Sequence, residues 1–249
     1  MEYYVKMSRK KKKDGVRNYS RYIIEHAKDN GKKCSDNVRG AKIYVASLKE
    51  MPKIYFRNPI RGLEQLIHLR TEADALRMKK ADMIYIIAHR DINLELYNAL
   101  LRISTSCIIV VFAPHNFHNL RRLATTYILS CKNQKMIHWF IKSAIEMIAL
   151  PSLVGLDYAD IRNIFLRNRK MDVKMYRGKY GDVSVASNMK KNYPRSDSFF
   201  LIYGSPKLNL DFINALGERM EKDSKYNIWA ARIIDNQRDV KIALFAGVE

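Results

Sequence analysis

Two aspartates three residues apart, Asp157 and Asp160, stand in the segment LVGLDYADIRNIF, between a proline-ended apolar run and a new helical pattern. Carboxylates near the N-terminus of a helix stay ionised at little cost, and they can orient a water molecule or bind a cation. Short acidic side chains also cap helices routinely, and a cap on the helix that starts near Tyr158 explains the same two residues. The sequence leaves both roles open.

A run of cations, Arg9, Lys10, Lys11, Lys12 and Lys13, is a second candidate site, because such side chains hold phosphate groups as point charges. The formal net charge of +20 predicts attraction to an anionic partner: DNA or another nucleic acid, an acidic membrane surface, or an acidic protein face. A solvated loop tip and a lysine-rich surface explain the same charges equally well.

Patterns of metal and enzyme sites are absent from the sequence. His115 and His118 have metal-like spacing without a further Cys or His nearby, so surface histidines explain them better than a zinc site. The cysteines Cys34, Cys107 and Cys131 are odd in number and lack metal spacing. No P-loop, GxGxxG or GxSxG motif occurs. We therefore expect no metal, no enzymatic activity and no small-molecule substrate.

The apolar runs are unsuited to membrane insertion, since the run 107–114 is too short and the run 136–154 contains charged residues. The N-terminal residues lack the apolar region of a secretory signal. We expect a cytoplasmic protein.

Short apolar runs alternate with amphipathic helical patterns through the first half of the chain. Apolar strands separated by helices predict an α/β domain with a Rossmann-like, doubly wound parallel sheet. The expected strands are 3–7, 42–47, 83–88 and 107–113, and the expected helices are 16–29, 59–79 and 93–103. A long central helix, Asn133 to Leu150, ends at Pro151.

The second half predicts a smaller α+β domain. It has expected helices at 158–168 and 209–221 and expected strands at 173–176, 198–204, 227–235 and 239–247. The last two strands are joined by a short polar segment, so we expect them to pair as a hairpin. We divide the chain into a nucleotide-binding-type domain (1–132), a connecting helix (133–152) and a C-terminal domain (153–249).

These elements, in this order, resemble FtsZ, the bacterial member of the tubulin superfamily. LPSLVGLDYADIRNIF (150–165) is similar to the family's PGLxNxDFADVRT, and FFLIYGSPKLNLDFINALGERM (199–220) to its strand and following helix. ADMIYIIA (81–88) and VVFAPHNFHNLRR (110–122) resemble ADMVFxxAG and VVTKPFNFEGxxR. The resemblance covers nearly the whole chain and implies the tubulin/FtsZ fold.

The phosphate-binding loops of the family are altered here. The glycine-rich loop corresponds to SRKKKKDGVRN, in which Asn18 alone survives, and GGGTGTG corresponds to the glycine-free HRDINLELYN (89–98). The ribose-binding Glu and Arg correspond to His118 and Arg122, and the guanine-binding acid falls at Lys135, next to Gln134. We also expect roughly thirty family residues, including a strand, to be missing ahead of the central helix. The resemblance therefore predicts a degenerate pseudo-GTPase without GTP or GDP as cofactor.

In the family, Asp157 and Asp160 would lie in the loop that enters the nucleotide pocket of the next filament subunit, although Gly155 stands where that loop has asparagine. The leading expectation is a non-catalytic FtsZ-like cytoskeletal or cell-division protein, which assembles with itself or docks on, and caps, an FtsZ filament. The alternatives are a basic module for DNA or acidic membrane on a reused fold, and a residual GTPase with an altered pocket.

Overall fold

The computed structural model describes residues 41–56, 60, 62–66, 68–129, 133–149, 156, 158–192, 196–221, 227–234 and 239–248. The strands are β1 (Ile43–Ser47), β2 (Leu63–Leu66), β3 (Met83–Ile87), β4 (Ile108–Phe112), β5 (Thr126–Ile128), β6 (Lys170–Gly178), β7 (Ser198–Gly204), β8 (Asn227–Ile233) and β9 (Val240–Gly247). The helices are α2 (Glu72–Leu76), α3 (Leu94–Ser104), α4 (His118–Leu123), α5 (Gln134–Ala149), α6 (Tyr158–Arg167), α7 (Ser184–Asn192) and α8 (Leu210–Glu221). None of the helices in these ranges has the length and apolar character that a bilayer crossing requires.

A single mixed sheet runs through the described residues in the order β2-β1-β3-β4-β5-β6-β9-β7-β8. Each pair of neighbours from β2 to β6 in this order is parallel, whereas β9 is antiparallel to both β6 and β7. Strands β1, β3 and β4 are buried along their whole length, which is typical of a parallel sheet covered on both faces. The α/β class and the doubly wound sheet are confirmed. The division at 132/133 and 152/153 stays a prediction, because the sheet continues across both points.

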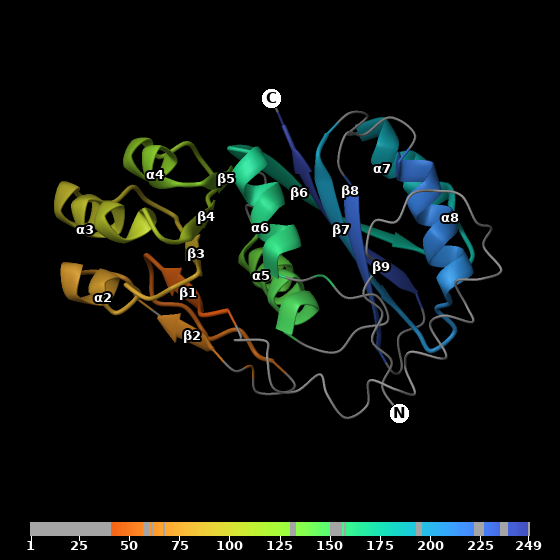
Figure 1. Cartoon of the computed structure of the whole chain (residues 1–249), viewed down its shortest axis with the longest axis horizontal. Coiled ribbons are helices and arrows are strands. Elements are labelled where there is room, and N and C mark those ends of the chain that lie inside the picture. Colours follow the sequence, from red (N-terminus) through yellow and green to blue (C-terminus); the bar gives the residue numbers. More distant parts are fainter. Residues whose placement is uncertain are drawn as a thin grey trace.

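Helices cover the sheet in layers (Figure 1). Helices α2, α3 and α4 lie to one side of the figure, α7 and α8 to the other, and α5 and α6 between them. The buried side chains of α5 and α6 form one core with the inner faces of β1, β3, β4, β7 and β9. The opposite faces form two separate cores, one with α2 to α4 and one with α7 and α8. The central helix expected at 133–150 is confirmed as α5, and it joins the two halves of the sheet.

The helix expected at 59–79 is wrong. Gly62 has a φ angle of 80°, a left-handed conformation that glycine adopts without strain and that interrupts a helix. Strand β2 begins at the next residue, Leu63, and pairs with β1. Helix α2 starts only after Thr71, whose side chain accepts a hydrogen bond from the Asp74 N–H in a capping box.

The hairpin expected from the last two strands is also wrong. Strand β7 lies between them: it pairs with β8 in parallel and with β9 antiparallel. Burial gives the reason, because β7 is buried at every position and needs neighbours on both sides, whereas β8 is partly exposed and suits the edge. A short strand, β5, lies directly before the central helix, and the expected loss of family residues ahead of that helix stays a prediction.

Candidate functional site

The order β2-β1-β3-β4-β5 places a topological switch point between β1 and β3, since the chain adds β2 on one side of β1 and β3 on the other. In sheets of this kind, ligands bind beyond the carboxyl ends of the strands at that point. Backbone hydrogen bonds hold these strand ends together: the Leu69 N–H donates to Ser47 O (2.6 Å), Leu48 N–H to Ile87 O (3.1 Å), and Ala88 N–H to Phe112 O (2.9 Å). The carboxyl edge of the sheet is therefore the first place to look for a site.

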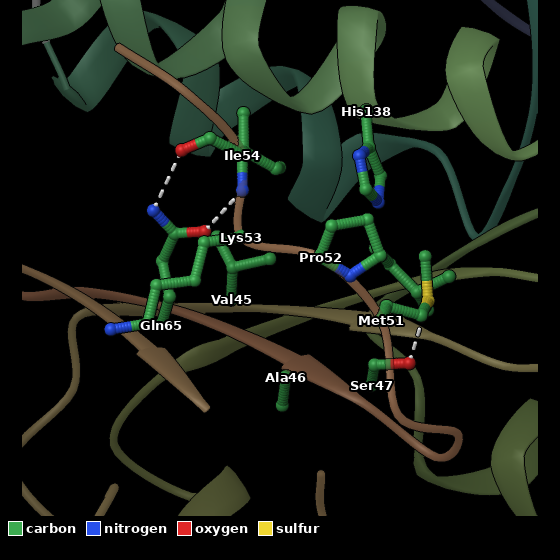
Figure 2. A pocket seen from close by; sticks show the side chains of 10 residues that line it. Val45, Ala46, Ser47, Met51, Pro52, Lys53, Ile54, Gln65 and His138 are labelled. Carbon is green, nitrogen blue, oxygen red and sulfur yellow. Dashed lines mark hydrogen bonds between the residues drawn. The ribbon is translucent and has the colours of Figure 1, made fainter. Parts of the chain in front are cut away.

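The segment that follows β1 folds back beside the sheet. Its start is held by Ser47, whose hydroxyl donates to the carbonyl of Lys49 (2.6 Å). Farther along, Gln65 of β2 clamps the backbone of Ile54: Oε1 accepts from the Ile54 N–H (2.7 Å) and Nε2 donates to its carbonyl (3.0 Å). Figure 2 shows both bonds, with His138 pointing from α5 towards Pro52.

The small hollow in Figure 2 lies between this segment, β1 and α5. It has a free volume of about 20 Å³, which holds one water molecule and is far too small for a nucleotide. Burial lowers the pKa of His138, which lines the hollow, so its imidazole favours the neutral form.

Asp91, in the loop between β3 and α3, binds the start of α4. Its carboxylate accepts hydrogen bonds from the N–H groups of Asn119 (3.0 Å), Leu120 (3.2 Å) and Ile92 (3.0 Å). The Asn119 side chain donates in return to the carbonyl of Ile92 (2.8 Å). The first free N–H groups of α4, where an anion would otherwise be favoured, are thus paired with a carboxylate of the chain itself.

The loop after β4 is also held in place by hydrogen bonds to a single side chain. The hydroxyl of Tyr127 accepts from the Phe117 N–H (3.0 Å) and donates to the carbonyl of His115 (2.6 Å). His118 and Arg122 follow on α4, one turn apart and both exposed. His118 shares the carboxyl edge with Gln134 and Lys135, which are exposed in the first turn of α5, after β5, whereas Arg122 lies in the last turn of α4.

Helix α6 lies at the opposite, amino-terminal edge of the sheet. The Tyr158 hydroxyl donates to the carbonyl of Asp82, just before β3 (2.7 Å), and Thr126 of β5 donates to the carbonyls of Phe165 and Asn168 (2.6 and 2.9 Å). Burial, followed by the carboxylate of Asp82, raises the pKa of Tyr158 to about 12, so it stays protonated as a donor. Asp160 is half-buried in the first turn of this helix.

Several predicted site residues lie outside the described ranges: Asn18, Gly155, Asp157 and the run from Arg9 to Lys13. Within those ranges, no group of three or more His, Cys, Asp or Glu side chains is placed to hold a metal ion. The sequence reasoning missed Asp91 and Gln65. An aspartate just beyond a buried strand, two residues before the helix cap Asn93, was the available signal for Asp91.

An ion pair that the sequence did not reveal joins α5 to the C-terminal strands. The buried carboxylate of Glu146 on α5 lies 3.0 Å from Arg232 Nη1 on β8 and 3.9 Å from Lys142 Nζ. Burial raises the pKa of Glu146, while Arg232 and Lys142 lower it. Breaking a buried ion pair leaves an uncompensated charge, so loss of this contact should destabilise the packing of β8 against α5.

No protein-family model and no curated protein sequence matches this chain. Solved structures do match. A single-residue mutant of FtsZ from M. jannaschii has a TM-score of 0.61 at 12% identity, over 93% of this chain and 95% of that chain. The empty FtsZ dimer of that organism has a TM-score of 0.61 at 12% identity, over 92% and 91%. CetZ2 from Haloferax volcanii, a GTPγS-bound protofilament, has a TM-score of 0.50 at 9% identity, over 68% and 66%.

At these identities the likeness establishes the fold. The chain has the tubulin/FtsZ fold over nearly its whole length, which confirms the fold that the sequence resemblance predicts.

Proposed function

We propose that this protein is a cytoskeletal-type protein that acts by associating with copies of itself, without guanine nucleotide and without GTP hydrolysis. The fold supports the first part, because it matches an FtsZ structure over 93% of this chain and 95% of that one. Two of the similar structures are assemblies, an FtsZ dimer and a CetZ2 protofilament. Self-association is therefore the property to test first.

The observation that carries the nucleotide-independent part is the placement of Asp91. Its carboxylate already accepts from the N–H groups of Asn119 and Leu120 at the carboxyl edge of the sheet. A phosphate brought to these N–H groups would have to displace Asp91 and would meet its negative charge. The glycine-free segment from His89 to Asn98, which forms the loop after β3 and the start of α3, adds to this argument, since side chains there keep a ligand away from the backbone.

Docking on an FtsZ filament is the second form of this proposal. The segment that precedes and begins α6 would serve as the docking loop, with Asp157 and Asp160 as its charged groups. Helix α6 is anchored to the amino ends of β3 and β5, so its first turn, which carries Asp160, lies near that edge of the sheet. A subunit that offers this end, but no nucleotide at the other, would cap a filament.

The test is sedimentation velocity of the full chain over a range of concentrations, with GTP, with GDP and without nucleotide. We expect association that rises with protein concentration and is the same in all three conditions. In parallel, the purified protein is denatured and its released nucleotide is measured by chromatography, with an FtsZ as the positive control. Stoichiometric guanine nucleotide, or association that needs GTP, would overturn the nucleotide-independent part. A monomer at every concentration that also leaves FtsZ polymerisation unchanged would overturn the rest.

A further inference from the structure

Exposed basic side chains follow four neighbouring strands at the carboxyl edge of the sheet. One lies after β1, and a pair follows each of β2, β3 and β4. We call these seven residues the basic row: Lys49, His68, Arg70, His89, Arg90, His115 and His118. His68 is half-buried and the other six are exposed. The row includes four of the five histidines in the described residues, and the fifth, His138, lines the hollow beside it.

The strand order makes these residues a row. Strands β2, β1, β3 and β4 lie side by side (Figure 1), and adjacent strands are about 4.8 Å apart, so their ends span about 14 Å. The bonds from Leu69 N–H to Ser47 O and from Leu48 N–H to Ile87 O hold three of the ends level. The cations are thus spread along a line.

The charges in the row act on one another. Burial, followed by the positive charges of Arg90, Lys49 and His68, lowers the pKa of His89. Arg70 Nε donates to Nδ1 of His68 (2.7 Å), so His68 is neutral while this contact is made and adds positive charge to the row only when the contact is broken. An anion laid along the row would relieve this repulsion between like charges.

The nearest carboxylates are paired with N–H groups of the chain itself, which stabilise their negative charge and do not remove it. Asp91 is held by three N–H groups. Asp74 accepts from the N–H groups of Arg70 and Thr71, and from the Thr71 hydroxyl (3.0, 3.0 and 3.1 Å). Glu50 and Glu95 are exposed near the row, so positive groups outnumber the solvated acidic ones along it.

The shape of this edge favours a ligand that lies across the surface. The hollow beside the row admits one water molecule, which excludes a nucleotide there. Lys49, Arg70 and Arg90 follow three neighbouring strands, and cations spread in this way match several phosphates in succession better than a single phosphate group. The net charge of +20 would also speed the approach of a polyanion.

We propose that the basic row binds the phosphodiester backbone of nucleic acid, through side-chain cations and without base recognition. The site differs from the run of Arg9 to Lys13, and the inference does not rest on the proposed self-association.

The test measures binding of a labelled single-stranded DNA of about 16 nucleotides, the upper end of common single-strand site sizes, by fluorescence anisotropy with the full chain. The row variant carries Lys49→Gln, Arg70→Gln and Arg90→Gln. The matched control removes three exposed cations from the C-terminal half: Arg177→Gln, Lys179→Gln and Lys207→Gln. Both variants lose the same net charge. Thermal melts of both variants check that they fold.

We expect the row variant to weaken binding on the order of 100-fold at about 0.1 M salt, and to reduce the slope of log K against log salt by about 2. The control variant should change the binding constant less than tenfold at the same salt concentration. The proposal is wrong if both variants weaken binding equally, if neither does, or if replacing Arg9 to Lys13 alone abolishes it. It is also wrong if DNA does not bind, or if polyglutamate, as a mimic of an acidic protein, binds more tightly than DNA.

Discussion

Asp91 satisfies three N–H groups with one carboxylate, and the residues around it depend on that arrangement. It connects the loop after β3 to the start of α4, which has no side-chain cap of its own at Phe117. A carboxylate at a helix N-terminus is also favoured by the helix dipole. Asp91 lies outside both α3 and α4, and it stabilises the loop after β3 together with the start of α4.

Replacing Asp91 with alanine should destabilise the protein by about 1.5 kcal/mol, the upper range for loss of a helix cap. Amide hydrogen exchange should speed up at Asn119 and Leu120, because their N–H groups lose their acceptor. Asp91→Asn keeps one acceptor oxygen, so its stability should lie between those of the wild type and of Asp91→Ala. The matched control is Asp182→Ala, which removes the acceptor of the Ser184 N–H at the start of α7. If that control changes exchange at Asn119 and Leu120 as much, Asp91 has no specific role there.

The acidic pair of the sequence, Asp157 and Asp160, gives a second prediction. If these residues form a docking loop, changing both to alanine should abolish any effect on FtsZ polymerisation and GTP turnover while the protein stays folded. If they only cap α6, stability should fall by about 1 kcal/mol per cap and the effect on FtsZ should remain. Light scattering and phosphate release from FtsZ, beside thermal melts, separate these outcomes. A double variant that still acts on FtsZ like the wild type would place the interface elsewhere.

At the scale of elements, the long apolar patterns were predicted well and the pairing of strands was not. Buried strands such as β3 are short continuous apolar runs and the 16-residue α5 has a clear helical period, so the sequence indicates both their type and their place. The three-residue β5 is too short to show a period. The pairing of β7 with β8 depends on burial over the whole sheet, which no local pattern near residues 235–239 contains.

The ion pair between α5 and β8 supplies a prediction at this scale. Arg232→Met should leave the buried Glu146 carboxylate poorly paired and destabilise the protein by about 3 kcal/mol near neutral pH. The folded-state pKa of Glu146 is raised, so its charge costs stability as pH rises through that pKa, and losing Arg232 raises it further. The penalty should therefore shrink as the pH is lowered to about 5. Urea unfolding at both pH values measures it.

The double variant Glu146→Gln/Arg232→Met is the control for this pair. It removes both charges, so most of the stability lost in Arg232→Met should return, and the difference from wild type should no longer depend on pH in this range. A penalty for Arg232→Met that is equal at both pH values would show that lost packing, and not the unpaired carboxylate, causes it.

At the scale of the whole molecule, the resemblance located the candidate edge but not how that edge is built. Of the residues matched by motif, His118, Gln134 and Lys135 follow the carboxyl ends of β4 and β5, whereas Arg122 lies in the last turn of α4. The basic row was not recognised, because its members are far apart in the sequence and meet only through the order β2-β1-β3-β4. A charge pattern of that kind can be found in the folded structure but not in the linear sequence.

The net charge of +20 leads to opposite salt dependences for the two proposed interactions. Between copies of the chain, like charges repel, and raising salt from about 0.1 M to about 1 M shortens the Debye length from about 10 Å to about 3 Å. Self-association should therefore strengthen with salt, whereas binding of DNA should weaken with salt because the release of counterions into a more concentrated salt solution is less favourable. Sedimentation velocity and anisotropy on the same samples measure both. The Arg177/Lys179/Lys207→Gln variant, with three fewer positive charges, should associate at lower salt than the wild type. If self-association instead weakens with salt, ion pairs between subunits hold the assembly together, and the repulsion between the basic surfaces does not limit it.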